Sequence, residues 1–126
     1  MQDPLRVSID GAVAEICLSG GKCNEIGSVL LEALENALLE IQNSECSVLL
    51  LCSGLDSGFC AGADLRELYL QMQEGTPESV YARLDSFLSR IHTLFNQIDS
   101  WDGIVIGAVE GVCFGGGLEL ALTCDM

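Results

Sequence analysis

The pattern of apolar and polar positions changes its period several times along the chain. Residues 5–9 and 12–18 are short apolar-rich runs joined at Asp10-Gly11, a pair that is typical of the turn in a β-hairpin. Between residues 25 and 42 the apolar positions recur with the helical period. The predicted apolar face of this helix consists of Leu30, Leu34, Ala37, Leu38 and Ile41. The first third of the chain therefore predicts a hairpin followed by an amphipathic helix.

Two later segments are apolar throughout, without alternation. Residues 47–52 and 104–109 have the pattern of parallel strands whose two faces are both buried. A glycine-bearing loop follows each of them, at residues 53–63 and at residues 111–117. Strands that alternate with helices along a chain predict an α/β fold with parallel strand pairing.

Three further helices are predicted by the residues at which they begin. Asp64 and Glu67 have the spacing of a capping box, with Asp in place of the more usual Ser or Thr. Thr76 is the expected N-cap of a longer helix, because Pro77 follows it at the first helical position. The apolar face of that helix would consist of Val80, Leu84, Phe87, Leu88, Ile91, Phe95 and Ile98. A last helix is expected to begin at Leu118.

Composition and charge narrow the classes of function. The chain has 126 residues, of which 49% are hydrophobic and only 6% aromatic, so we expect one globular domain, or part of a larger one, with an aliphatic core. The net charge is −14 and the five basic residues are scattered, which argues against nucleic-acid binding. The apolar runs are too short to span a membrane, and the first residues lack the pattern of a secretory signal. The expected location is the cytoplasm.

The cysteines and the single histidine give no sign of a metal site. There are seven cysteines, an odd number, and no two of them form a C-x-x-C pair. Most lie within apolar runs, so we expect reduced thiols that behave as small hydrophobic side chains. His92 lies on the polar stripe of its predicted helix and is expected at the surface. The sequence therefore predicts no zinc cluster.

The two glycine-bearing loops are the best candidates for chemistry. Residues 57–65 and 111–121 each follow a predicted strand and lead into a helix, with small residues that let the backbone approach a ligand closely. Free N–H groups at the start of a helix favour negative charge. Two such turns that converge would form an oxyanion hole, in which two donors stabilise one developing negative charge. The alternative is a pair of ordinary glycine-rich turns between strand and helix.

These segments resemble the two fingerprints of the crotonase superfamily, the enoyl-CoA hydratase/isomerase fold. The matching residues are Phe-Cys-Ala-Gly-Ala-Asp-Leu at 59–65 and Gly-Gly-Gly-Leu-Glu-Leu-Ala at 115–121. Cys124-Asp125 lies at the family's usual distance, and Asn24 resembles an asparagine of the family. The resemblance implies a spiral of ββα units. Residues 1–126 would form the N-terminal part of a single domain that is truncated before its C-terminal helices.

The resemblance also implies roles for individual residues. The backbone N–H groups of Ala63 and Gly116 would form the oxyanion hole, and Glu119 matches the first of two catalytic glutamates. An acyl-CoA thioester would be the ligand, and coenzyme A would enter only as part of the substrate, with no other cofactor and no metal. The expected substrate-binding residues are Lys22, Cys60, Ala61, Gly62, Asp64 and Gly115. A full-length protein would be a homotrimer or a dimer of trimers.

Several of these residues have a second interpretation from their surroundings in the sequence. Glu119 has only apolar neighbours, so its carboxylate is expected to be desolvated, as suits a general acid or base. A glutamate in a first helical turn can also simply favour the helix dipole. Lys22 and Arg66 could reach phosphates of coenzyme A or be solvated charges. Asp64 is favoured as a helix cap over an acid catalyst.

The departures from the family pattern lie outside the proposed chemistry. Gly103-Ile104 stands where the family usually has Lys-Pro, and Glu110-Gly111 where it often has Asn-Gly. The leading hypothesis is an enoyl-CoA hydratase-like lyase. The alternatives are a double-bond isomerase or another reaction of the family, or a non-catalytic acyl-CoA-binding or structural fragment. By itself the 126-residue chain is expected to be inactive, because the second carboxylate would follow Met126.

Overall fold

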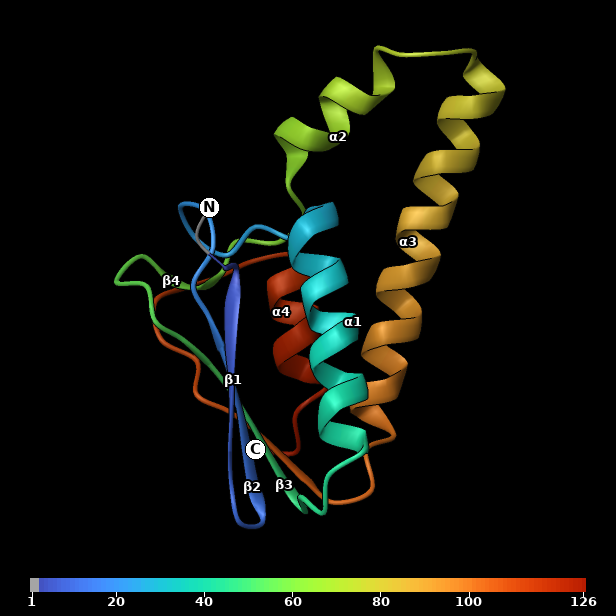
Figure 1. Cartoon of the computed structure of the whole chain (residues 1–126). Helices are drawn as coiled ribbons and strands as arrows, with labels where there is room; N and C mark the ends of the chain where they lie inside the picture. Colours follow the sequence, from blue (N-terminus) through green and yellow to red (C-terminus); the bar gives the residue numbers. More distant parts are fainter. Residues whose placement is uncertain (1–2) are drawn as a thin grey trace.

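A four-stranded sheet with helices packed along one side forms the body of the molecule (Figure 1). The structure is a computed structural model that describes residues 3–126, so Met1 and Gln2, part of the segment in which no secretory signal is predicted, lie outside it. In chain order the elements are β1 (Leu5–Asp10), β2 (Val13–Leu18), α1 (Ser28–Gln42), β3 (Val48–Ser53), β4 (Gly58–Cys60), α2 (Leu65–Met72), α3 (Pro77–Asp99), β5 (Ile104–Gly107), β6 (Val112–Cys113) and α4 (Gly116–Leu122).

The main sheet confirms the predicted α/β architecture. Its strand order is β1-β2-β3-β5, with β1 and β2 antiparallel and the other two pairs parallel. The hairpin turns at Gly11, whose φ of +61° lies in the left-handed region that glycine adopts without steric penalty. Helix α1 connects β2 to β3, and α2 and α3 connect β3 to β5, as parallel pairing requires.

The core lies between the sheet and helices α1 and α3, which run alongside each other in Figure 1. All five positions predicted for the apolar face of α1 are buried. On α3 the prediction is wrong at Leu88, which is 51% exposed, and it misses Leu94, which is buried. Leu94 follows Ile91 by three residues and precedes Ile98 by four, so it falls on the same buried stripe.

The opposite face of the sheet differs from the prediction that both faces are buried. Leu49 and Leu51 of β3 point into the core, but Leu50 and Cys52 on the other face are only half-buried. Ile104 of β5 is 50% exposed. Among residues 3–126 no helix covers this face, so the strands have one buried and one accessible side despite their uniformly apolar sequence.

A second, two-stranded parallel sheet forms inside the segments predicted as loops. Strand β4 pairs with β6, Gly58 opposite Val112 and Cys60 opposite Cys113. Strands of three and two residues are too short to show a period in the sequence, and their partners lie more than 50 residues apart. Helix α4 then begins at Gly116, two residues before the predicted start at Leu118. This sheet places the two glycine-bearing turns side by side.

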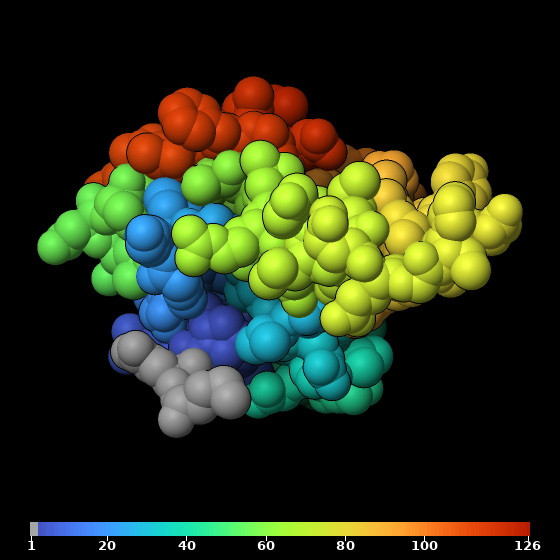
Figure 2. All heavy atoms as spheres, turned by 90° about the horizontal axis from the view of Figure 1, so that it is seen from above, coloured from blue at the N-terminus to red at the C-terminus, as the bar shows by residue number. Residues whose placement is uncertain are grey.

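Helices α2 and α3 begin at the caps that the sequence predicts. The side chain of Asp64 accepts a hydrogen bond from the Glu67 N–H, and Thr76 caps α3 in the same way, with Pro77 in its first turn. Helix α2 buries none of its residues and, with the connection to α3, extends from the top of the molecule (Figure 1), so that it faces the viewer when the molecule is seen from above (Figure 2). Within residues 3–126 no helix is both long enough and apolar enough to cross a bilayer.

Candidate active site

The two glycine-bearing turns meet through their backbones. A Cβ placed on Gly62 would lie 3.2 Å from the amide nitrogen of Gly116, and one placed on Gly116 would lie 3.8 Å from the amide nitrogen of Ala63. Gly62 has a φ of +95° and Gly115 a φ of +48°, conformations that favour glycine. The turn after β4 and the turn after β6 are therefore close enough for their N–H groups to share one ligand atom.

The N–H groups expected to form the oxyanion hole have no acceptor among the described residues. Ala63 forms a parallel bridge with Ile26, in which Ile26 N–H donates to the Gly62 carbonyl (2.8 Å) and Asp64 N–H donates to the Ile26 carbonyl (2.9 Å). In this arrangement the N–H of Ala63 points away from Ile26. Within residues 3–126, neither Ala63 nor Gly116 donates a backbone hydrogen bond. Two free donors on adjacent turns are what an oxyanion hole requires.

Close packing of α4 on β4 fixes the distance between the turns. A Cβ on Gly117 would overlap the carbonyl oxygen of Cys60 and lie 2.8 Å from its carbonyl carbon. Phe114 N–H donates to the same carbonyl oxygen over 3.1 Å. Leu120, one turn further along α4, is buried in the core. The start of α4 is therefore held against β4 by backbone contacts that only glycine at position 117 permits.

Asn24 ties the loop after β2 to the first of the two turns. Its side chain is fully buried, and its Nδ2 donates to the Ser53 hydroxyl and to the Phe59 carbonyl, each over 2.8 Å. Its Oδ1 accepts a hydrogen bond from the Gly20 N–H over 2.9 Å. One side chain thus joins the loop after β2, the end of β3 and the middle of β4.

Only half of the predicted capping box forms. Asp64 caps α2, but the Glu67 carboxylate turns to α1, where it accepts hydrogen bonds from the Ser28 N–H (2.9 Å) and the Ser28 hydroxyl. The N-cap residue of α1 is Gly27, which has no side chain to supply that bond. Glu67 therefore caps a helix that begins 39 residues before it, an interaction that no local sequence pattern could indicate.

A cleft of about 450 Å³ opens beside the first turn. The residues that line it are Gly21, Lys22, Glu25, Ala61, Ala63, Asp64, Leu65 and Arg66. It brings together three of the residues predicted to bind substrate, Lys22, Ala61 and Asp64, next to the free Ala63 N–H. The charged groups balance in number, since the lining contains two cations, Lys22 and Arg66, and two carboxylates, Glu25 and Asp64.

Cys60 cannot present its side chain to this cleft. The thiol is fully buried and donates to the Asn24 carbonyl over 3.1 Å. Burial, as the largest effect, raises the pKa of the Cys60 thiol to about 11. Cys60 therefore remains a protonated packing residue at neutral pH, and its carbonyl is occupied by the Phe114 N–H.

Glu119 lies in the first turn of α4, and the described residues do not desolvate it as expected. The helix turns Gly117 and Leu120 inward and leaves Leu118, Glu119 and Leu122 exposed. Residues adjacent in sequence point in different directions around a helix, so the apolar neighbours of Glu119 do not enclose it. The carboxylate is accessible to water and to any ligand that reaches this side of α4.

His92, on α3, is exposed, as predicted.

Comparison with known proteins shows the family to which the chain belongs. The family model for enoyl-CoA hydratase/isomerase matches residues 8–126. The chain belongs to this family. It is 36% identical over 119 residues to the human enoyl-CoA hydratase domain-containing protein 2, mitochondrial, and 30% identical over 104 residues to human methylglutaconyl-CoA hydratase, mitochondrial. These alignments cover 93% and 82% of the chain.

Solved structures confirm the fold. The enoyl-CoA hydratase of Bacillus anthracis aligns over 98% of the chain with a TM-score of 0.81 and 30% identity. That of Shewanella pealeana aligns over 98% with a TM-score of 0.83 and 25% identity. The crotonase-like α/β fold expected from the sequence is therefore confirmed. The chain spans 46% and 45% of these two proteins, and 38% and 28% of the two human relatives.

Proposed function

We propose that the protein acts on acyl-CoA thioesters as an enoyl-CoA hydratase-type lyase, adding water across an α,β-unsaturated thioester or removing it. The observation that supports the proposal is the pair of free N–H donors, Ala63 and Gly116, on two turns in backbone contact. The thioester carbonyl would accept hydrogen bonds from both. Negative charge that develops on its oxygen when water attacks the β-carbon would be stabilised, by about 3 kcal/mol for each donor.

In this proposal Glu119 handles the proton. Its carboxylate would accept a proton from the attacking water or return one to the α-carbon, the work of a general acid or base. Its place in the first turn of α4, three residues after the Gly116 donor, supports the role because one helix positions both groups. Its exposure leaves it accessible to water, which is the second reactant.

The cleft beside the first turn would hold part of the coenzyme A. Its wall carries Lys22 and Arg66, whose cations can pair with phosphate oxygens, and the small residues Ala61 and Ala63. A thioester reaching from this cleft would pass the Ala63 N–H. The substrate class proposed here rests on that adjacency and on the family to which the chain belongs.

The test is Glu119→Gln in the full-length protein, assayed with a crotonyl thioester. Loss of a general acid or base lowers the rate by roughly 10²–10⁴, and we expect turnover to fall by that factor while acyl-CoA affinity stays within a few-fold. Glu110→Gln is the matched control, because Glu110 is also exposed and precedes the same turn. Turnover of Glu119→Gln at the wild-type rate would refute the role of Glu119.

The second candidate is double-bond isomerisation, favoured by the presence of a single glutamate in α4 next to the donors. One carboxylate can remove a proton from one carbon and return it to another without water entering the product. Mass spectrometry distinguishes the two reactions, because hydration adds the mass of water and isomerisation in D₂O gives only exchange. Binding of an acyl-CoA by calorimetry without either product would indicate a non-catalytic binding protein.

A further inference from the structure

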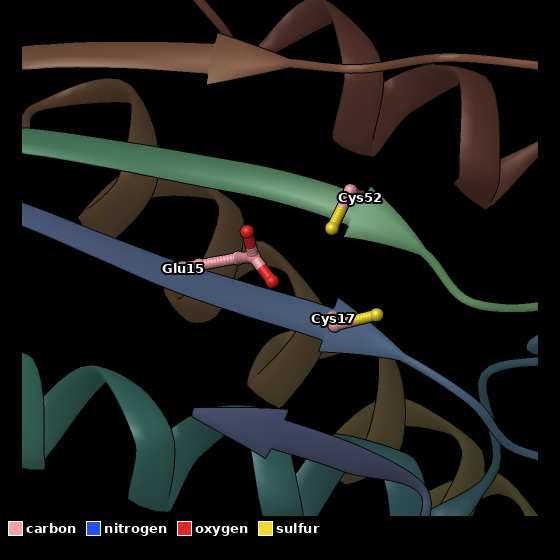
Figure 3. A group of neighbouring side chains, drawn as sticks. All are labelled: Glu15, Cys17 and Cys52. Atoms are coloured by element: carbon pink, nitrogen blue, oxygen red, sulfur yellow. The ribbon is translucent and has the colours of Figure 1, made fainter. Parts of the chain in front are cut away.

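Three side chains with metal-binding atoms, none of them assigned to the candidate active site, lie together on the accessible face of the main sheet (Figure 3). Glu15 and Cys17 come from β2 and Cys52 from β3, and their ligand atoms all lie within 4.8 Å of one another. Cys17 and Cys52 are direct partners in the parallel register. Glu15 precedes Cys17 by two residues, so both side chains are on the same face of the strand.

The cluster forms only in the folded chain, and no sequence pattern predicts it. Cys17 and Cys52 are separated by 34 intervening residues and by helix α1, with none of the short ligand spacings of known zinc motifs. Parallel pairing of β2 with β3 brings them into register. The expectation of no metal cluster rested on the absence of a C-x-x-C pair and on the single histidine, and it does not take cross-strand pairs into account.

The geometry suits a cation that prefers sulfur. In a tetrahedral zinc site, bonds of about 2.3 Å to sulfur place two thiolates about 3.8 Å apart. The observed limit of 4.8 Å is therefore within about 1 Å of that arrangement, a difference that side-chain rotation on fixed strands can close. Two sulfurs and one carboxylate would leave a fourth position for water, as in zinc sites with three protein ligands.

The surroundings of Cys52 hold its thiol in the protonated form, so a cation that binds there has to displace the proton. Burial, then the hydrogen bond and the charge of Cys17, and then Glu15, raise the pKa of the Cys52 thiol to about 12. Three groups that become negative therefore converge on one point. The nearby cation is the Arg6 guanidinium, which donates to the Cys17 sulfur over 3.9 Å.

We propose that Glu15, Cys17 and Cys52 bind a thiophilic divalent cation of the Zn²⁺ class. Binding replaces the two thiol protons, so one M²⁺, two thiols and one carboxylate give a complex of net charge −1 and two released protons. The net charge of −14 attracts cations to the surface in general. The two sulfurs select a soft metal over Mg²⁺ or Ca²⁺, which prefer oxygen ligands.

Co²⁺ is the first probe, because its visible absorption reports geometry and its ultraviolet charge-transfer bands report thiolate ligands. We expect one equivalent to bind the reduced protein with thiolate charge-transfer bands, and Zn²⁺ to displace it. Cys52→Ser should abolish the bands, and Glu15→Gln should weaken binding about tenfold or more, since even indirect partners of metal ligands typically contribute 10–100-fold. Cys46→Ser is the control, because Cys46 is a half-buried thiol outside the cluster.

Two further measurements keep the test independent of folding defects. Calorimetry of Zn²⁺ binding in buffers of different ionisation enthalpy should show about two protons released per ion. Zn²⁺ should raise the melting temperature of wild type and of Cys46→Ser, but not that of Cys52→Ser. Cys52 is substituted in preference to Cys17 because Cys52 is half-buried and Cys17 is buried, so its replacement disturbs the packing less. Charge-transfer bands that survive in Cys52→Ser, or binding without proton release, would overturn the proposal.

Discussion

Asn24 has a backbone conformation that most side chains avoid, and its hydrogen bonds explain why it is there. Its φ of +54° lies in the left-handed region, where asparagine is among the few tolerated residues. The amide is fully buried and serves three polar groups from three segments. Two of these groups, the Gly20 N–H and the Phe59 carbonyl, belong to the backbone and bond to the Asn24 side chain. The folded loop therefore depends on this one side chain.

We expect Asn24→Ala to lower the free energy of unfolding by about 3 kcal/mol or more, because buried backbone groups lose their partners. Asn24→Gly should be less destabilising than Asn24→Ala by about 1 kcal/mol, since glycine adopts the positive φ freely. Urea denaturation measures both, with Asn36→Ala, at an exposed position of α1, as the control. Equal stabilities of Asn24→Gly and the control would show that the amide hydrogen bonds contribute nothing.

The buried Cys60 thiol predicts a loss of stability at alkaline pH. Its folded-state pKa is raised from 9.0 to about 11, chiefly by burial. Between these values the unfolded chain releases the thiol proton and the folded chain retains it, so stability falls as pH rises from 9 to 11. Cys60→Ser keeps a donor for the Asn24 carbonyl but does not titrate in this range. We expect a flatter curve of unfolding free energy against pH for Cys60→Ser, and an unchanged slope would contradict the prediction.

Glu119 shows what sequence reasoning at the level of single residues misses. Its apolar neighbours led to the expectation of a desolvated carboxylate, whereas α4 presents that carboxylate at the surface. Positions 117 and 120 of the same helix point inward. In a helix of seven residues the sequence pattern is too short to predict which side faces the core. Ala63 and Gly116, which the resemblance to the family implies as donors, lie on adjacent turns with free N–H groups. Their role as oxyanion donors stays a prediction, and it depends on the backbone and not on side-chain direction.

At the level of elements, two neighbouring glycines of α4 should respond differently to the same substitution. A Cβ on Gly116 would meet other atoms only at 3.6 Å or beyond, which is ordinary contact. A Cβ on Gly117 would overlap the Cys60 carbonyl, a backbone group that cannot move aside. We expect Gly116→Ala to be nearly neutral and Gly117→Ala to destabilise by about 1–3 kcal/mol, as overpacking does. Thermal denaturation of both variants measures this, and equal melting temperatures would mean that α4 does not pack on β4 as described.

Long periodic elements were predictable and the short paired ones were not. The predicted hairpin, α1, β3 and α3 all occur within about three residues of their expected bounds. The two helices have a clear helical period, β3 is a continuous apolar run, and the hairpin has a turn signal. Strands β4 and β6 have five residues in total, with glycine at one end, and exist because each supplies the other's hydrogen-bond partners. These two strands bring the turns together, so the candidate site depends on the part of the fold that local patterns do not show.

At the scale of the whole molecule, an unbroken apolar strand does not reveal how many of its faces are covered. Strands β3 and β5 have the composition of doubly buried strands, yet in residues 3–126 only the side facing α1 and α3 is closed. The accessible side carries the Glu15, Cys17 and Cys52 cluster. The α/β class and the order of elements follow from the sequence, whereas the coverage of each face follows only from the assembled layers.

The distribution of charge bears on how the chain would meet an acyl-CoA. The net charge is −14, while the cleft beside Ala63 holds two cations, Lys22 and Arg66, opposite two carboxylates, Glu25 and Asp64. Close to the cleft the charges cancel. Further away the phosphates of coenzyme A would face a negative surface, and that repulsion acts over a distance that dissolved salt shortens to about 10 Å at 0.1 M.

We therefore expect acyl-CoA affinity to rise with salt, because screening removes long-range repulsion while leaving the contacts with Lys22 and Arg66 largely intact. This is opposite to the behaviour of a basic phosphate-binding site, whose affinity falls with salt. Calorimetric titration at several NaCl concentrations measures the slope, and the matching thioester of pantetheine, which has no phosphate, is the control and should show little dependence. Lys22→Ala should weaken binding at every salt concentration without reversing the slope. An affinity that falls as salt is added would show that the two cleft cations outweigh the charge of the molecule as a whole.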